Sequence, residues 1–171
     1  MSVAALQPFY DGWAKHQALV IDALLGLTVE QLDLRSAPHQ WGIWQVAGHV
    51  AGSRAYWFHD ALGEGDPATR NLFRVDRTTV PGLPLEDAGW EDDEDHHRSA
   101  EELVDGLRRS WTMVDDCLRR WTAEELDTLV VRTSRTHHRG WVVWHVMEHD
   151  LHHGGEISQI LGSNGLSGLD L

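Results

Sequence analysis

Twelve histidines stand out in this chain of 171 residues, because imidazole nitrogens bind transition metals when several of them converge. Two of them, His149 and His153, are four residues apart in a segment with helical periodicity. Residues at that spacing share one helix face, about 6 Å apart along the axis, so both rings can reach a single ion. A helical wheel places both on the apolar side, facing the interior, and places His145 and His152 outside the apolar arc.

A repeated motif supplies a third histidine. Residues 41–49 and 141–149 share the pattern Trp-x-x-Trp-x-Val-x-x-His, and each copy opens a predicted helix. Two equivalent helices of this kind indicate a bundle of two similar halves, in which His49 and His149 can approach each other. The shared positions are also compatible with shared packing alone. His49 lies at the edge of the apolar arc of its helix, which suits a residue lining a cleft and also suits a solvated one.

Three neutral imidazoles would leave at least one coordination position of a bound metal open, as in catalytic rather than structural zinc sites. A water or a thiol at that position would lose its proton near neutral pH and become a nucleophile. Imidazole suits zinc, nickel, copper and iron alike, so the donors do not select the metal. Cys117 is the single cysteine and is predicted to be a packing residue, so a reacting thiol would have to come from a cosubstrate.

Two further residues are candidates for the site. Glu156 lies one turn beyond His153 and could orient a ligand or act as an acid or base, with an ordinary ion pair as the alternative. Arg54 falls on the apolar side of its helix and is a candidate anchor for an acidic substrate. A dimer interface or a small error in helix register would explain its position as well. Glu148 and Asp150 point about 100° to either side of His149 and are weaker candidates.

Four segments with three- and four-residue apolar spacing must position these residues. We expect helices over residues 7–27, 42–62, 99–121 and 140–161, the third beginning at a capping box on Ser99. Residues 67–95 hold three of the five prolines and an acidic run, which predicts a long crossover loop that partly covers a site. Residues 129–139 read as an extended basic connection. Without convincing β-alternation, the sequence predicts one all-α domain over residues 1–171, a four-helix bundle with a loosely held tail at 162–171.

Composition narrows the function classes. The formal net charge of −13 repels phosphate backbones and anionic lipids, so we expect neither nucleic acid nor membrane surfaces as partners. One cysteine rules out a disulfide within the chain. No signal peptide or apolar run of membrane length is visible, which favours a cytoplasmic protein.

The pattern resembles the DinB/YfiT-like superfamily of four-helix metalloproteins. The matching pieces are the Trp-rich opening of the second helix with Gly48-His49-Val50, and the fourth-helix run at 149–157. The resemblance covers nearly the whole chain in helix order and lengths, including the long link between the second and third helices. It implies that His49, His149 and His153 bind a divalent ion, usually zinc or nickel in that family. Members with assigned activity use low-molecular-weight thiols such as mycothiol or bacillithiol in S-transfer or in isomerising maleylpyruvate, and many members have no known reaction.

Three classes of function follow. The first is a metal-dependent transferase or hydrolase that acts on a small molecule, with a thiol cosubstrate. The second is a non-catalytic protein of the same fold that binds a metal or a small ligand. The third is a structural bundle that associates through tryptophan-rich faces and binds no metal. We expect a homodimer in every case, because a small helical domain with nine tryptophans has an apolar face left over.

Overall fold

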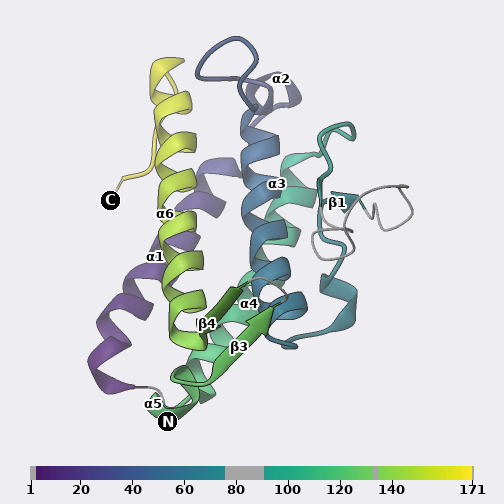
Figure 1. Cartoon of the computed structure of the whole chain (residues 1–171). Helices are drawn as coiled ribbons and strands as arrows, with labels where there is room; N and C mark the ends of the chain where they lie inside the picture. The colour runs from purple at the N-terminus through teal and green to yellow at the C-terminus, as the bar shows by residue number, and fades with distance from the viewer. Residues whose placement is uncertain (1–2, 76–90, 133–134, 171) are drawn as a thin grey trace.

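Four long helices pack side by side in the computed structural model, which describes residues 3–75, 91–132 and 135–170 (Figure 1). They are α1 (Gln7–Leu24), α3 (Ile43–Arg54), α4 (Ala100–Arg120) and α6 (Arg139–Ser163), with the short helices α2 (Val29–Leu32) and α5 (Ala123–Leu126) in the connections. The all-α four-helix bundle is confirmed. No helix in the described ranges has both the length and the apolar character needed to cross a lipid bilayer.

Local sequence signals explain where the helices begin. The Ser99 hydroxyl accepts a hydrogen bond from the Glu102 amide at 3.2 Å, and the Glu102 carboxylate accepts one from the Ser99 amide at 2.8 Å. This reciprocal capping satisfies two amides that the first turn of α4 leaves without helical partners. At the start of α3, the side chain of Gln45 accepts a hydrogen bond from the Gly42 amide at 2.9 Å.

The second predicted helix, over residues 42–62, changes character near its middle. It is α-helical to Arg54 and continues as a π-helix over Ala55–Ala61. The wider π turns alter which side chains face the bundle. Phe58 is fully buried and stacks on Trp121 with ring centroids 5.8 Å apart, while Trp57 packs edge-on against Trp141 of α6.

Buried apolar side chains form two clusters, one toward each end of the bundle. The first includes Leu24, Ile43, Leu103 and Ile157, and the second includes Trp13, Phe58, Val114 and Val146. On each long helix, buried polar residues lie between the positions that contribute to the two clusters: His16 and Gln17 on α1, Arg54 on α3, Ser110 on α4 and Asp150 on α6. A polar layer therefore crosses the middle of the core.

Two antiparallel ribbons lie in the connections between the long helices. Strand β1 (Arg74–Val75) pairs with β2 (Glu91–Asp92), and β3 (Leu129–Arg132) pairs with β4 (Arg135–His138). The connection predicted to be extended at residues 129–139 contains β3 and β4, whose pairing satisfies amides that an isolated extended segment would leave to solvent. Residues 76–90 of the predicted crossover loop lie outside the described residues. The β1–β2 pairing places β2 against α3.

The predicted loose tail contacts the bundle at two positions. Helix α6 continues to Ser163, past the expected stop at Gly162. Leu166 and Leu169 pack against the first apolar cluster, and the Leu169 amide donates a hydrogen bond to the Ser158 hydroxyl at 3.0 Å. These contacts anchor the tail at two points, while the other described residues from 162 to 170 are exposed.

A close contact between α1 and α6 gives a prediction about stability. A Cβ atom at Gly154 would lie 2.2 Å from Nε2 of His16, whereas one at Gly155 would meet no atom within 4 Å. Gly154→Ala should therefore destabilise the fold by about 1–3 kcal/mol, because the buried His16 ring has to move. Gly155→Ala is the matched control and should stabilise it by up to about 1 kcal/mol, because alanine is the better helix former. Urea unfolding followed by circular dichroism measures both, and equal midpoints for the two variants would contradict the packing described.

Candidate metal centre

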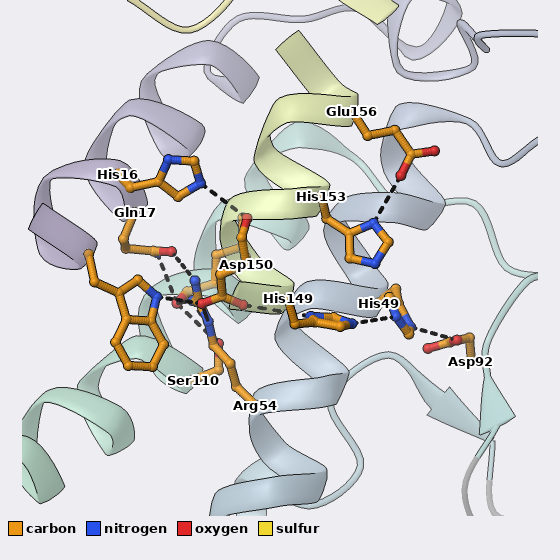
Figure 2. A network of polar contacts seen from close by, with 12 residues as sticks. His16, Gln17, His49, Arg54, Asp92, Ser110, His149, Asp150, His153 and Glu156 are labelled. Carbon is orange, nitrogen blue, oxygen red and sulfur yellow. Dashed lines mark hydrogen bonds and ion pairs between the residues drawn. The ribbon is translucent and has the colours of Figure 1, made fainter. Parts of the chain in front are cut away.

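Helices α3 and α6 bring three imidazole rings together (Figure 2). His49 lies on α3, and His149 and His153 lie one turn apart on α6. Nε2 of His49 and Nε2 of His149 are 2.8 Å apart, and one potential ligand atom from each ring lies within 4.8 Å of the others. The side chains are 14–16% exposed, so the cluster is neither sealed in the core nor free in solvent. These are the three residues that the sequence predicts to bind a metal ion.

Carboxylates hold two of the rings from behind. Nδ1 of His49 lies 2.8 Å from Oδ2 of Asp92, and Nδ1 of His153 lies 2.9 Å from Oε2 of Glu156. In each contact the carboxylate accepts a hydrogen bond from Nδ1–H, which leaves the Nε2 lone pair free to face the centre of the cluster. Carboxylates in this position orient metal-binding histidines in many proteins.

Asp92 is the site residue that the sequence did not assign. It belongs to the acidic run at 91–95, which was read as part of a crossover loop near a site. Only the pairing of β2 with β1 places this particular carboxylate against α3. The position of Glu156 fits the predicted role of orienting a ligand, and its predicted role as an acid or base stays a prediction.

The His153 ring is uncharged at neutral pH. Burial lowers the pKa of His153 to about 4, outweighing the hydrogen bond to Glu156, and the neighbouring rings of His149 and His49 act in the same direction as burial. Metals bind the neutral form of imidazole, so no proton has to leave this ring first.

A second, overlapping grouping shares one of these histidines. His152, His153 and Glu156 also place one potential ligand atom each within 4.8 Å of one another. His152 is exposed, however, and Glu156 is already engaged by Nδ1 of His153. His145, the other histidine placed outside the apolar arc, stacks on Trp141 with centroids 4.8 Å apart and the ring planes at 11°.

Arg54 is not available to bind a substrate. Its side chain is 1% exposed, and its Nε donates a hydrogen bond to Oδ2 of Asp150 at 2.8 Å. The other guanidinium nitrogens donate to the side chain of Gln17 and the backbone oxygen of Leu107. The prediction of an anchor for an acidic substrate is therefore corrected, because the arginine neutralises a buried carboxylate within the protein. The wheel placed Arg54 correctly on the inner side of its helix.

His16 of the same polar layer gives a prediction about pH. It is buried, and its Nε2 lies 3.1 Å from the backbone oxygen of Asp150. Burial lowers the pKa of His16 and Arg54 lowers it further, against the opposing effects of the backbone hydrogen bond and the charge of Asp150. Below pH ~6.5 the unfolded chain therefore binds a proton that the folded chain does not. The stabilising contribution of neutral His16 is complete above that pH and is lost as the pH falls toward the lower folded pKa.

We expect His16→Gln to reduce the loss of stability between about pH 7 and pH 5, by at most about 1.4 kcal/mol per pH unit. Urea unfolding of both proteins at each pH measures this difference. The same slope in wild type and variant would show that His16 is not responsible.

A four-helix bundle that presents three histidines from two helices defines a class of candidate metalloproteins. The chain belongs to the DinB superfamily, whose sequence model matches residues 13–157. Solved structures show the same fold: a DinB-like protein from Bacillus cereus is 21% identical with a TM-score of 0.66, and the match covers 97% of each chain. A conserved protein from Enterococcus faecalis is 18% identical with a TM-score of 0.65, covering 94% of this chain and 95% of that one.

A DinB-like protein from Bacillus subtilis is 13% identical with a TM-score of 0.60, covering 91% of this chain and 90% of that one. At these identities the structural likeness shows the fold alone. No curated protein matches the sequence.

Proposed function

We propose that this protein is a divalent-metal-dependent enzyme of the DinB type, in which His49, His149 and His153 hold one ion. The observation that carries the proposal is the convergence of the three rings within 4.8 Å, with carboxylates behind two of them. The Nε2–Nε2 distance of 2.8 Å is that of a hydrogen bond, in which one ring donates its proton to the lone pair of the other. A bound ion would replace that proton. Three imidazole nitrogens are a donor set suited to zinc or nickel.

When bound, such an ion would lower the pKa of a water or a thiol and so supply a nucleophile at neutral pH. The protein's own residues orient the donors: Asp92 and Glu156 fix two rings, and the partial exposure of all three admits a small molecule. Three protein ligands leave a position for that molecule.

The protein does not supply the thiol itself. Cys117 is buried in α4, and burial, together with the negative charge of Glu64, raises its pKa to about 12. We therefore propose a low-molecular-weight thiol of the mycothiol or bacillithiol kind as cosubstrate in S-transfer or isomerisation. Hydrolysis by an activated water is the other reaction of the same site.

A non-catalytic metal or small-ligand binding protein is the second candidate. The observation that favours it is that the two carboxylates beside the cluster, Asp92 and Glu156, are both engaged by ring nitrogens. A carboxylate held in this way is less available to move protons to and from a substrate.

Metal analysis of protein purified without a histidine tag tests metal binding, and about one ion per chain is expected. An assay panel of thiols with electrophiles and of hydrolysable esters and amides, run before and after chelation and after metal is restored, separates the two candidates. Turnover that disappears with chelator and returns with metal supports the enzyme. One ion per chain without such turnover supports the binding protein, and no bound ion at all would contradict both the metal-dependent enzyme and a metal-binding protein.

Oligomeric state, location and partners stay predictions. The homodimer is expected to form through the exposed apolar side chains Phe9 on α1 and Trp144 and Leu151 on α6, two helices that contact each other. Sedimentation velocity should give twice the mass of the chain, and a single species of 19.3 kDa would contradict the dimer. A small-molecule substrate and a cytoplasmic location remain part of the proposal, as does the expectation of no nucleic-acid or membrane partner, which rests on the net charge of −13.

A further inference from the structure

We infer that Asp150 is a positioning residue of this centre, whose buried carboxylate accepts a hydrogen bond from Nδ1–H of His149 when the Nε2 of that ring binds a cation. The inference rests on the proposed metal site and adds a residue outside the three histidines and their two carboxylate partners. It also gives a role to the polar layer that crosses the core.

Two unsatisfied buried atoms face each other at this point. Asp150 has a fully buried side chain whose Oδ2 accepts hydrogen bonds from Trp13 at 2.7 Å and from Arg54 at 2.8 Å. Its other oxygen, Oδ1, has no hydrogen-bond partner among the described residues, and neither does Nδ1 of His149. These two atoms are 3.9 Å apart. Because buried polar atoms are rarely left unpaired, a complementary pair this close points to a state in which they bond.

The position of the proton on each neighbouring ring explains why Nδ1 of His149 and Oδ1 of Asp150 are not hydrogen-bonded. Asp92 accepts a hydrogen bond from Nδ1–H of His49, so Nε2 of His49 carries a lone pair. Its 2.8 Å contact with Nε2 of His149 then places the proton of His149 on Nε2. In that form, Nε2 of His149 has no lone pair for a cation, and the unprotonated Nδ1 lies toward Asp150.

Coordination by Nε2 of His149 requires the proton of that ring to be on Nδ1 instead. A movement of about 1 Å would then bring Nδ1 and Oδ1 of Asp150 to hydrogen-bond distance. Each of the three rings would have its own carboxylate: Asp92 for His49, Glu156 for His153 and Asp150 for His149. Such partners fix the ring's tautomer and raise its basicity toward the metal.

Arg54 holds the Asp150 carboxylate in place. Its guanidinium donates a charge-assisted hydrogen bond to Oδ2 of Asp150 at 2.8 Å. Arg54 is itself held by Gln17 on α1 and by the Leu107 backbone on α4, so the carboxylate cannot turn away. In Figure 2, Asp150 lies between this network and the three histidines.

Asp150→Asn tests the role with little change in shape. The amide oxygen can keep the donors from Arg54 and Trp13, and the amide nitrogen then faces Nδ1 of His149. An amide donor stabilises the tautomer with the proton on Nε2, and in this tautomer Nε2 cannot bind a cation. We expect the dissociation constant for zinc to rise by about 10- to 100-fold.

Ser110→Ala is the control for disturbing the polar layer. It removes a hydroxyl that lies 3.5 Å from Arg54 and does not touch Asp150, and it should leave zinc affinity within about threefold. Circular dichroism and urea unfolding of each variant show that the zinc titrations are made on folded protein.

Long-range proton–nitrogen NMR on ¹⁵N-labelled wild type provides a readout that needs no variant. The His149 ring should carry its proton on Nε2 without metal and on Nδ1 with zinc bound. A zinc-loaded His149 with no proton on Nδ1, or an Asp150→Asn variant with unchanged zinc affinity, would overturn the role of Asp150 and leave the metal site standing. A wild type that binds no zinc would overturn both. If Asp150→Asn fails to fold, the NMR result on wild type decides.

Discussion

His149→Ala should reduce the zinc content of the purified, untagged protein from about one ion per chain to a small fraction of that value. His149 is the ring that joins the two helices, because it contacts His49 of α3 and lies one turn from His153 on α6. Removing one of three nitrogen donors should cost about 3 kcal/mol of binding, or two orders of magnitude in affinity. Isothermal titration with zinc measures the affinity, and elemental analysis measures the content.

Two further variants distinguish the overlapping groupings around His153. His49→Ala removes a donor of the proposed centre and leaves His152, His153 and Glu156 in place, whereas His152→Ala does the reverse. We expect loss of zinc with His49→Ala and retention with His152→Ala. If the His149→Ala and His49→Ala variants kept their zinc and the His152→Ala variant lost it, the ion would instead be assigned to the grouping that contains His152.

The second large effect is on folding. Arg54→Met should lower the free energy of unfolding by about 3–5 kcal/mol, because it leaves the Asp150 carboxylate buried without a countercharge. Methionine fills most of the volume of the arginine stem, so the change reports mainly on the charge and its hydrogen bonds. Urea unfolding followed by circular dichroism measures the loss.

An exposed arginine on α4 provides the matched control. Arg119 pairs with Asp115 one turn away, with its side chain 74% exposed, and Arg119→Met should leave the unfolding midpoint unchanged. In the double variant Arg54→Met with Asp150→Leu, the loss should be smaller than the sum of the two single losses, because no unpaired charge remains. An Arg54→Met protein as stable as wild type would contradict the assignment of this pair as the centre of the polar layer.

The sequence predicted the helices and the three converging histidines, because both depend on periodicity. The wheel that placed His149 and His153 inward uses only residues of one helix, and the repeat added His49 at the equivalent position. The DinB superfamily membership suggested by those motifs is confirmed.

Contacts between distant segments were beyond the same reasoning. Asp92 meets His49 only because a two-stranded ribbon forms, and the wheel had no means of pairing Arg54 with Asp150, 96 positions away. A helical wheel places residues by the apolar character of their neighbours. A charged residue on the inner face, such as Arg54, is then hard to tell from an error in the assumed helix register. Two further details depend on surfaces that other segments supply: the backbone pairing of β3 with β4, and the contacts of Leu166 and Leu169 with the first apolar cluster.

The carboxylates behind the rings have a consequence for the protein as a whole. Asp92 and Glu156 bring negative charge within one imidazole width of the cluster, in a chain whose formal net charge is already −13. A dication there would act as an internal counterion to the carboxylates of Asp92 and Glu156. Its binding energy would then add to the resistance of the bundle to unfolding. The loaded and stripped proteins should accordingly melt at different temperatures, which makes the centre part of the architecture as well as a place for chemistry.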